Sequence, residues 1–133
     1  MVETYNSSQL TISVQILAHE DQAKCNLTVK LSLVEPTTVR LIHETEVVHG
    51  SMQPKFVPFG IKDVFDQSQN LKMVFTVSDS QESGPQEVGT SETNLTKVLI
   101  ATNSTSILEI CSGGEIKGHI TLKYDHTMAE SIT

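Results

Sequence analysis

The chain has no tryptophan and few basic side chains. Its 133 residues include 9 lysines and arginines against 16 aspartates and glutamates, which gives a formal net charge of −7. A protein that binds nucleic acid needs basic side chains along one surface to displace counterions from phosphates. Because basic residues are so few, we do not expect nucleic acid as a partner. The negative net charge also opposes docking on anionic lipid, unless a cation bridges the two surfaces.

Cysteine is also scarce. Cys25 and Cys111 lie far apart, and no partner pair stands at metal-site spacing, so both are expected to be free thiols. The histidines show neither His-x-His nor Glu-x-x-His spacing, so we expect no zinc site. They are His19, His43, His49, His119 and His126. No Ser-His-Asp or Cys-His set can be argued from spacing, so the sequence predicts no enzyme.

Long apolar runs are missing as well. No stretch approaches the roughly 20 apolar residues of a membrane-spanning helix. Residues 1–8 hold neither a basic region nor an apolar run, so they do not resemble a signal peptide. We therefore expect a cytoplasmic protein, with a peripheral position at a membrane or on a larger assembly left open.

The chain does contain short segments in which apolar and polar residues alternate. Leu71, Met73, Phe75 and Val77 share one face of such a segment, which is typical of a half-buried strand. Turn residues separate the segments at the spacing of an antiparallel sandwich. The eight predicted strands are 10–17, 27–33, 39–48, 56–61, 71–77, 88–94, 106–111 and 117–124.

The sequence also predicts where the domain begins and ends. Residues 95–101 have apolar residues at helical spacing, which indicates one short helix, and a helical turn is expected within 63–70. One domain is expected over residues 9–126, after a flexible leader at 1–8 and before a fraying tail at 127–133.

Four motifs in order along the chain resemble those of C2 domains. They are Gln53-Pro54-Lys55-Phe56, Val77-Ser78-Asp79-Ser80-Gln81, Gln86-Glu87-Val88-Gly89 and Lys117-Gly118-His119-Ile120-Thr121-Leu122. The last motif and the opening strand are most similar to the first C2 domain of copines. The resemblance implies an all-β fold, an eight-stranded antiparallel β-sandwich of type II topology with one short helix.

The resemblance also implies where calcium would bind. C2 domains hold calcium between loops with about five carboxylates, and one such loop is expected at 78–88. When the ligand positions of the family are mapped onto this sequence, the first falls on Glu20 or Asp21. Asp79 keeps the aspartate of the family at its position. The other positions carry amides, namely Asn26, Gln81 and Gln86.

These replacements decide the expected function. Calcium takes about six to eight oxygen ligands, and an amide oxygen does not offset the charge of the ion. We therefore expect no cofactor, although Glu82 and Glu87 leave room for one weak, rearranged calcium site. The sequence favours a non-catalytic, calcium-independent module for binding protein or a scaffold. The alternative is a calcium-dependent module of copine type that targets anionic phospholipid membranes.

Overall fold

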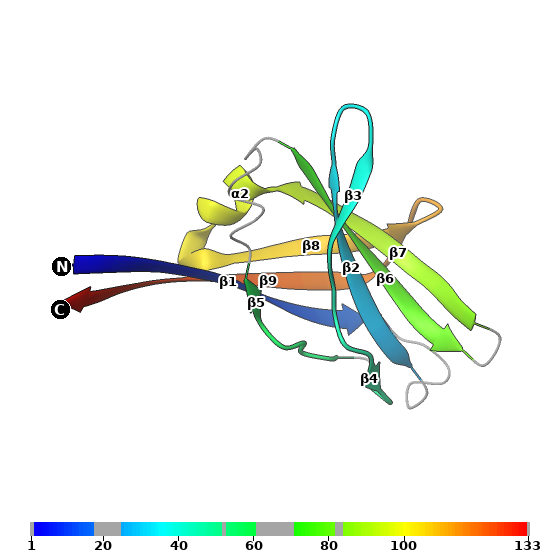
Figure 1. Cartoon of the computed structure of the whole chain (residues 1–133). Coiled ribbons are helices and arrows are strands. Elements are labelled where there is room, and N and C mark those ends of the chain that lie inside the picture. Colours follow the sequence, from blue (N-terminus) through cyan, green and yellow to red (C-terminus); the bar gives the residue numbers. More distant parts are fainter. Residues whose placement is uncertain (1, 18–24, 52, 61–70, 82–83, 133) are drawn as a thin grey trace.

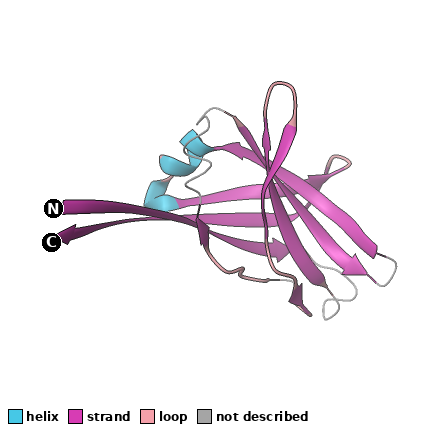
Figure 2. Ribbon diagram, in the orientation of Figure 1, coloured by secondary structure: helices cyan, strands magenta, loops and turns pink. Residues whose placement is uncertain are grey.

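The structure is a computed structural model that describes residues 2–17, 25–51, 53–60, 71–81 and 84–132. Within these residues it contains nine β-strands, one short helix and one 3-10 turn (Figures 1 and 2). The elements in chain order are β1 (Val2–Ile16), β2 (Asn26–Val34), β3 (Val39–Glu44), β4 (Val48–His49), β5 (Phe59–Gly60), β6 (Lys72–Gln81), β7 (Gly84–Asn94), α2 (Leu95–Leu99), η2 (Thr102–Ser104), β8 (Thr105–Ser112) and β9 (Glu115–Ile132).

The strands form one curled antiparallel sheet that folds over on itself. Its order is β3-β2-β6-β7-β8-β9-β1-β5, and β4 pairs with β2 off this path. Strands β7 and β8 are registered at one described pair, Thr90 with Cys111, so the sheet divides there into two layers. In Figure 1, β2, β3, β6 and β7 cross the layer of β8, β9 and β1. This confirms the predicted all-β sandwich with a short helix.

The buried side chains confirm the predicted alternation. Leu10, Ile12 and Val14 of β1 are buried, and so are Met73, Phe75 and Val77 of β6. They meet in one apolar core between the layers, to which β2, β8, β9 and α2 also contribute. Its further members are Cys25, Leu27, Val29, Leu31, Leu33, Phe56, Leu95, Val98, Ile110, Ile120 and Leu122. Burial of this apolar surface is the main stabilising contribution to the fold.

The predicted strand at 39–48 is divided into β3 and β4, which gives nine described strands instead of eight. The division occurs at Thr45, which is buried. Its hydroxyl accepts a hydrogen bond from the Val29 backbone N–H at 2.9 Å and lies 3.2 Å from the Thr28 hydroxyl. Its own N–H donates to the Val29 carbonyl at 2.9 Å. The Thr45 hydroxyl thus supplies a hydrogen-bond acceptor for the buried Val29 N–H, which allows the strand to be interrupted at this residue.

Two glycines of the sequence motifs lie where strands approach closely. A Cβ on Gly118 would overlap the carbonyl oxygen of Gln15 in β1. A Cβ on Gly89 would lie 2.8 Å from the carbonyl oxygen of Cys111, beside the junction of the two layers. Both positions need glycine for space, which gives the glycines of the Gln86–Gly89 and Lys117–Leu122 motifs a packing reason.

The Gln53–Phe56 motif pairs with β1 without forming a regular strand. The Val14 N–H donates to the Pro54 carbonyl at 3.0 Å, and the Phe56 N–H donates to the Ile12 carbonyl at 2.9 Å. Phe56 is buried in the core. Of the predicted strand 56–61, β5 is the part that is a strand among the described residues, because Pro58 has no N–H to donate and the Val57 N–H donates to the Glu46 carboxylate instead.

The sandwich closes on one side through a seam between β3 and β5. The rings of His43 and Phe59 stack with centroids 3.8 Å apart and planes 9° apart. Nearby, the Val57 N–H donates to the Glu46 carboxylate at 2.9 Å. Burial lowers the pKa of His43, and the charge of Glu46 partly opposes this shift.

The ladder of β1 and β9 extends into the segments that were predicted as leader and tail. Residues 2–8 and 127–132 continue β1 and β9, and they pair from Val2 with Ile132 inward (Figure 1). Backbone hydrogen bonds can form such a ladder whatever the side chains are, so their polar sequence did not reveal it. The domain limits themselves stay a prediction. The helical turn expected within 63–70 lies outside the described residues.

No helix in the described part of the chain is long and apolar enough to cross a membrane.

Candidate functional site

The residues that match calcium ligands lie at the end of the sandwich opposite the two termini (Figure 1). Asn26 opens β2, Asp79 and Gln81 close β6, and Gln86 stands near the start of β7. In the sheet, Asp79 pairs with Leu27 on one side and with Gln86 on the other. The structure therefore brings together four of the predicted positions. The fifth position, Glu20 or Asp21, lies outside the described residues.

The expected loop at 78–88 is mostly strand. β6 and β7 stay paired as far as Gln81 with Gly84, with a bulge between Val77 and Ser78. The polar side chains of this stretch gave no alternation signal, whereas the backbone groups continue the ladder. The bulge makes Val88 the extra residue of β7, since Gly89 pairs with Val77 and Glu87 with Ser78. A long hairpin replaces the predicted loop.

The Asp79 carboxylate is engaged on both oxygens. Its Oδ1 accepts the backbone N–H of Asn26 at 2.9 Å. Its Oδ2 accepts the Nε2–H of Gln81 at 2.6 Å. The amide of Gln81 therefore acts as a hydrogen-bond donor to the neighbouring ligand position. In this arrangement Asp79 ties β2 to the end of β6.

The side-chain amide of Asn26 is engaged at both ends too. Its Nδ2 donates to the carbonyl of Ser80 at 3.3 Å. Its Oδ1 accepts the backbone N–H of Gly50 at 3.2 Å and lies 3.1 Å from His49 Nδ1. An aspartate here would lose the donor to Ser80. The amide thus has a structural role, joining β2 to β4 and β6.

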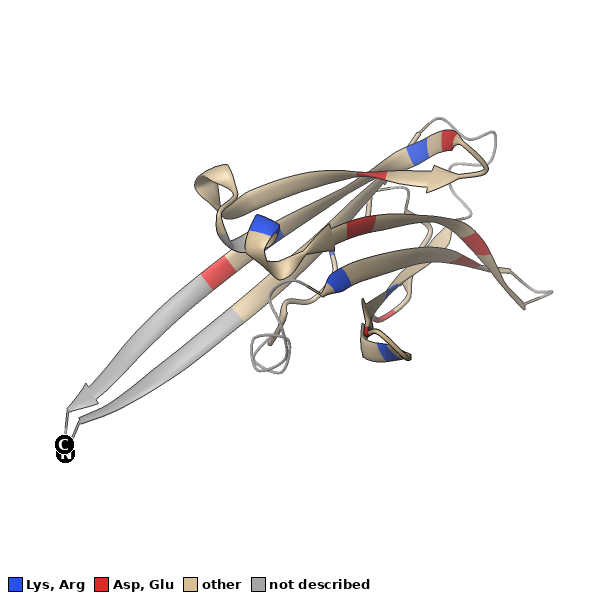
Figure 3. Ribbon diagram, turned by 90° about the horizontal axis from the view of Figure 1, so that it is seen from above, with Lys and Arg blue, Asp and Glu red and all other residues tan. Residues whose placement is uncertain are grey.

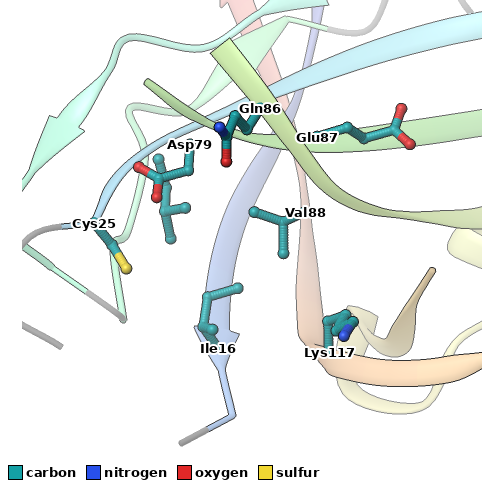
Figure 4. A pocket seen from close by; sticks show the side chains of 8 residues that line it. Ile16, Cys25, Asp79, Gln86, Glu87, Val88 and Lys117 are labelled. Atoms are coloured by element: carbon teal, nitrogen blue, oxygen red, sulfur yellow. The ribbon is translucent and has the colours of Figure 1, made fainter. Parts of the chain in front are cut away.

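These contacts leave little for a metal ion. Among the described residues, no group of three or more His, Cys, Asp or Glu side chains is placed to hold one. At the four described ligand positions Asp79 is the one carboxylate, and calcium sites gain affinity from the number of such charges. Glu87, which pairs with Ser78 in the sheet, points away from the other residues in Figure 4.

Beside these residues a cavity of about 230 Å³ opens between the ends of the two layers. Figure 4 shows Val88 and Ile16 pointing into it, with Asp79 and Gln86 along one side. Leu27, which is fully buried, completes the apolar part of its wall. The remaining lining residues are Cys25, Glu87 and Lys117. The cavity therefore combines an apolar wall with a polar side.

Lys117 is the basic residue of this lining. Its ammonium lies 2.8 Å from Glu115 Oε2. The hydrogen bond and the charge of Lys117 lower the pKa of the Glu115 carboxyl. The positive charge at the cavity therefore already has a partner.

Sequence reasoning did not assign Val88, Cys25 or Lys117 to a site. No site role was predicted for Cys25, which is buried and lines the cavity. Lys117 lines the cavity next to Gly118, where β9 lies close to β1. Long-range packing of this kind leaves no signal in the local pattern.

Basic residues do not gather on one face of the described structure. Lys30 lies on β2, whereas Lys55 bridges to Ser13 of β1 in the other layer. Arg40 forms an ion pair with Glu35 at 3.3 Å. Figure 3 shows the lysines and arginines dispersed among acidic residues. The described basic residues therefore do not form one positive patch.

No protein-family model matches the chain. No curated protein matches it either.

Solved structures do match over nearly the whole chain. BON1-C2B covers 96% of this chain and 92% of its own, with a TM-score of 0.62 and 20% identity. A C2 domain of plant extended synaptotagmin 1 covers 89% and 93%, with a TM-score of 0.57 and 18% identity. A further C2 domain covers 90% and 98%, with a TM-score of 0.56 and 14% identity. Together with the two-layered antiparallel sheet, these matches show that the chain has the fold of a C2 domain.

Proposed function

We propose that this chain is a non-catalytic C2-type module that binds protein and acts without calcium. The observation that carries the proposal is the hydrogen bonding of Asp79 and Asn26. Both Asp79 oxygens and the Asn26 side-chain oxygen accept hydrogen bonds from the protein itself. These are the atoms with which a calcium site would have to begin. Beyond these bonds, the four described positions offer an ion the charge of Asp79 alone, whereas calcium takes about six to eight oxygen ligands and gains affinity from several carboxylates.

The charge of the chain supports the same proposal. A net charge of −7 repels anionic lipid, and the described basic residues form no patch that would compensate for it. Calcium could bridge the two surfaces only through a site with several carboxylates. A protein partner needs no such ion, and a sandwich offers sheet faces, edges and cavities for it. We place this activity in the cytoplasm, on a protein assembly or at a membrane.

The test is a calcium titration by isothermal calorimetry, combined with sedimentation of phosphatidylserine vesicles in calcium and in chelator. We expect no binding heat from micromolar to low millimolar calcium and no calcium-dependent sedimentation. Heat at micromolar calcium with calcium-dependent sedimentation would overturn the proposal. The chain would then be a calcium-dependent phospholipid-binding module, as the resemblance to copines implies.

A further inference from the structure

The cavity at the site has room for one side chain. Its volume of about 230 Å³ lies below the roughly 300–1,000 Å³ of pockets for drug-sized ligands. It is several times the volume of one water molecule, which takes up roughly 30 Å³ in the liquid. An occupant of this size is a single large side chain rather than a nucleotide or a lipid tail.

The lining calls for a side chain that is apolar along its length and polar at its end. Ile16, Leu27 and Val88 supply apolar contacts from three different strands. The Asp79 carboxylate and the Gln86 amide lie together along another side, as a cross-strand pair (Figure 4). Long basic side chains have this character, because they bury their methylene groups and keep the charged end in a polar setting.

The charges of the described residues select a cation. Three ion pairs occur among these residues, Arg40–Glu35, Lys72–Glu92 and Lys117–Glu115, and none of them includes Asp79. Each Asp79 oxygen accepts one hydrogen bond from the protein, and a carboxylate oxygen has two lone pairs. Asp79 can therefore accept two more hydrogen bonds. Lys117 does not compete for them, since it is held by Glu115.

We propose that this cavity binds the arginine side chain of a partner protein. The inference rests on the proposed protein-binding function and names the chemistry of its partner. The guanidinium donates two parallel hydrogen bonds to the Asp79 oxygens, and its methylene groups lie against Val88 and Ile16. Arginine fits better than lysine, because its planar fork matches a carboxylate. The net charge of −7 additionally draws a basic segment toward this protein.

The test is an NMR titration of the ¹⁵N-labelled chain with N-acetyl-arginine amide as probe. The comparison probes are the citrulline analogue, which has nearly the same shape without the charge, and N-acetyl-leucine amide. We expect the arginine probe to shift the amide signals of Leu27, Val88 and Lys117. We expect citrulline and leucine to bind about tenfold more weakly or worse, since a charged hydrogen bond is lost.

Two variants locate the interaction. Asp79→Asn keeps an acceptor for the Asn26 N–H but removes the charge, so arginine should bind about tenfold more weakly. Glu92→Gln is the matched control. It removes a carboxylate that belongs to β7 but pairs with Lys72 outside the cavity, and it should leave binding unchanged.

Three results would overturn the inference: no shift with arginine at millimolar concentration, equal binding of citrulline, or equal binding by Asp79→Asn. None of them would affect the proposed function, which depends on the calcium and vesicle experiment. Conversely, calcium binding detected by calorimetry would overturn the proposed function, whether or not the arginine probe binds. Retained dispersion of the amide signals shows that each variant is folded, and the citrulline comparison needs no variant at all.

Discussion

Replacing Gly118 with alanine tests whether close approach of β1 and β9 is what requires glycine in the last strand. A Cβ at this position would overlap the carbonyl oxygen of Gln15 and lie 3.0 Å from the Cα of Ile16. Both contacts are backbone atoms of β1, and Ile16 is the registered partner of Gly118. Neither atom can move away by changing a rotamer. The two strands would have to separate locally.

We expect Gly118→Ala to lower the free energy of unfolding by about 3 kcal/mol, the upper part of the usual range for overpacked sites. Urea denaturation followed by circular dichroism measures it. With an m-value of about 2 kcal/mol/M, the midpoint should fall by about 1.5 M.

Gly114→Ala is the matched control. Gly114 has a φ of +81°, and a Cβ there would meet nothing within 4 Å. The left-handed backbone alone should cost about 1 kcal/mol. If Gly118→Ala is no more destabilising than Gly114→Ala, the reasoning from close approach is refuted.

The remaining predictions concern the seam, the interrupted strand and the calcium positions. Thr45→Val leaves the buried Val29 N–H without the hydroxyl as acceptor, so unfolding in urea should show a loss of about 1–3 kcal/mol. His43→Phe keeps an aromatic ring against Phe59 and should flatten the pH dependence of stability. Because burial lowers the pKa of His43, the unfolded chain takes up this proton at higher pH than the folded chain. The stabilising contribution of neutral His43 should therefore be fully present above the usual pKa of histidine. It should be lost as the pH falls toward the lowered pKa of His43 in the folded chain. Placing carboxylates at three positions together should produce heat of calcium binding in calorimetry, whereas the unchanged chain is expected to produce none. The changes are Asn26→Asp, Gln81→Asp and Gln86→Asp.

Each of these predictions has its own control. Thr105→Val removes an exposed hydroxyl bonded to the Asn103 carbonyl and should be nearly neutral; an equal loss at Thr45 and Thr105 would contradict the role of Thr45. For His43, the free energy of unfolding is compared at pH 5 and pH 7 in the unchanged chain and in His43→Phe. An equal change with pH in the two chains would show that His43 does not cause the pH dependence of stability. If the triple-aspartate chain also gives no heat of calcium binding, geometry rather than charge prevents calcium from binding.

Much of the sandwich could be predicted from local pattern. The cores of β1, β2, β6 and β9 alternate clearly enough that a shift by one residue would expose their apolar face. The helix at Leu95 was predicted from apolar spacing, and the structure adds its cap, since Asn94 Oδ1 accepts the Lys97 N–H at 2.9 Å. Where a side-chain pattern carried the information, the prediction is confirmed.

The candidate site could be predicted only as a set of positions. Motif order placed Asn26, Asp79, Gln81 and Gln86 at one site, and the sheet register brings them together. Their hydrogen bonds could not be predicted. The two bonds between Asn26 and β6 each join a side chain to a backbone group more than 50 residues away in the sequence. The cavity was missed for the same reason. Its lining comes from five strands and the residue before β2.

The sequence by itself thus determined the faces of most strands, the short helix and the scarcity of carboxylates at the positions that match calcium ligands. These follow from the period of apolar residues and from the charge of single side chains, which are local properties. Only the tertiary structure decided that β6 and β7 form one long hairpin, that Asp79 and Asn26 are engaged within the protein, and that a cavity opens beside them. Those features depend on which backbone groups meet across the sheet, and no local pattern of side chains records that meeting.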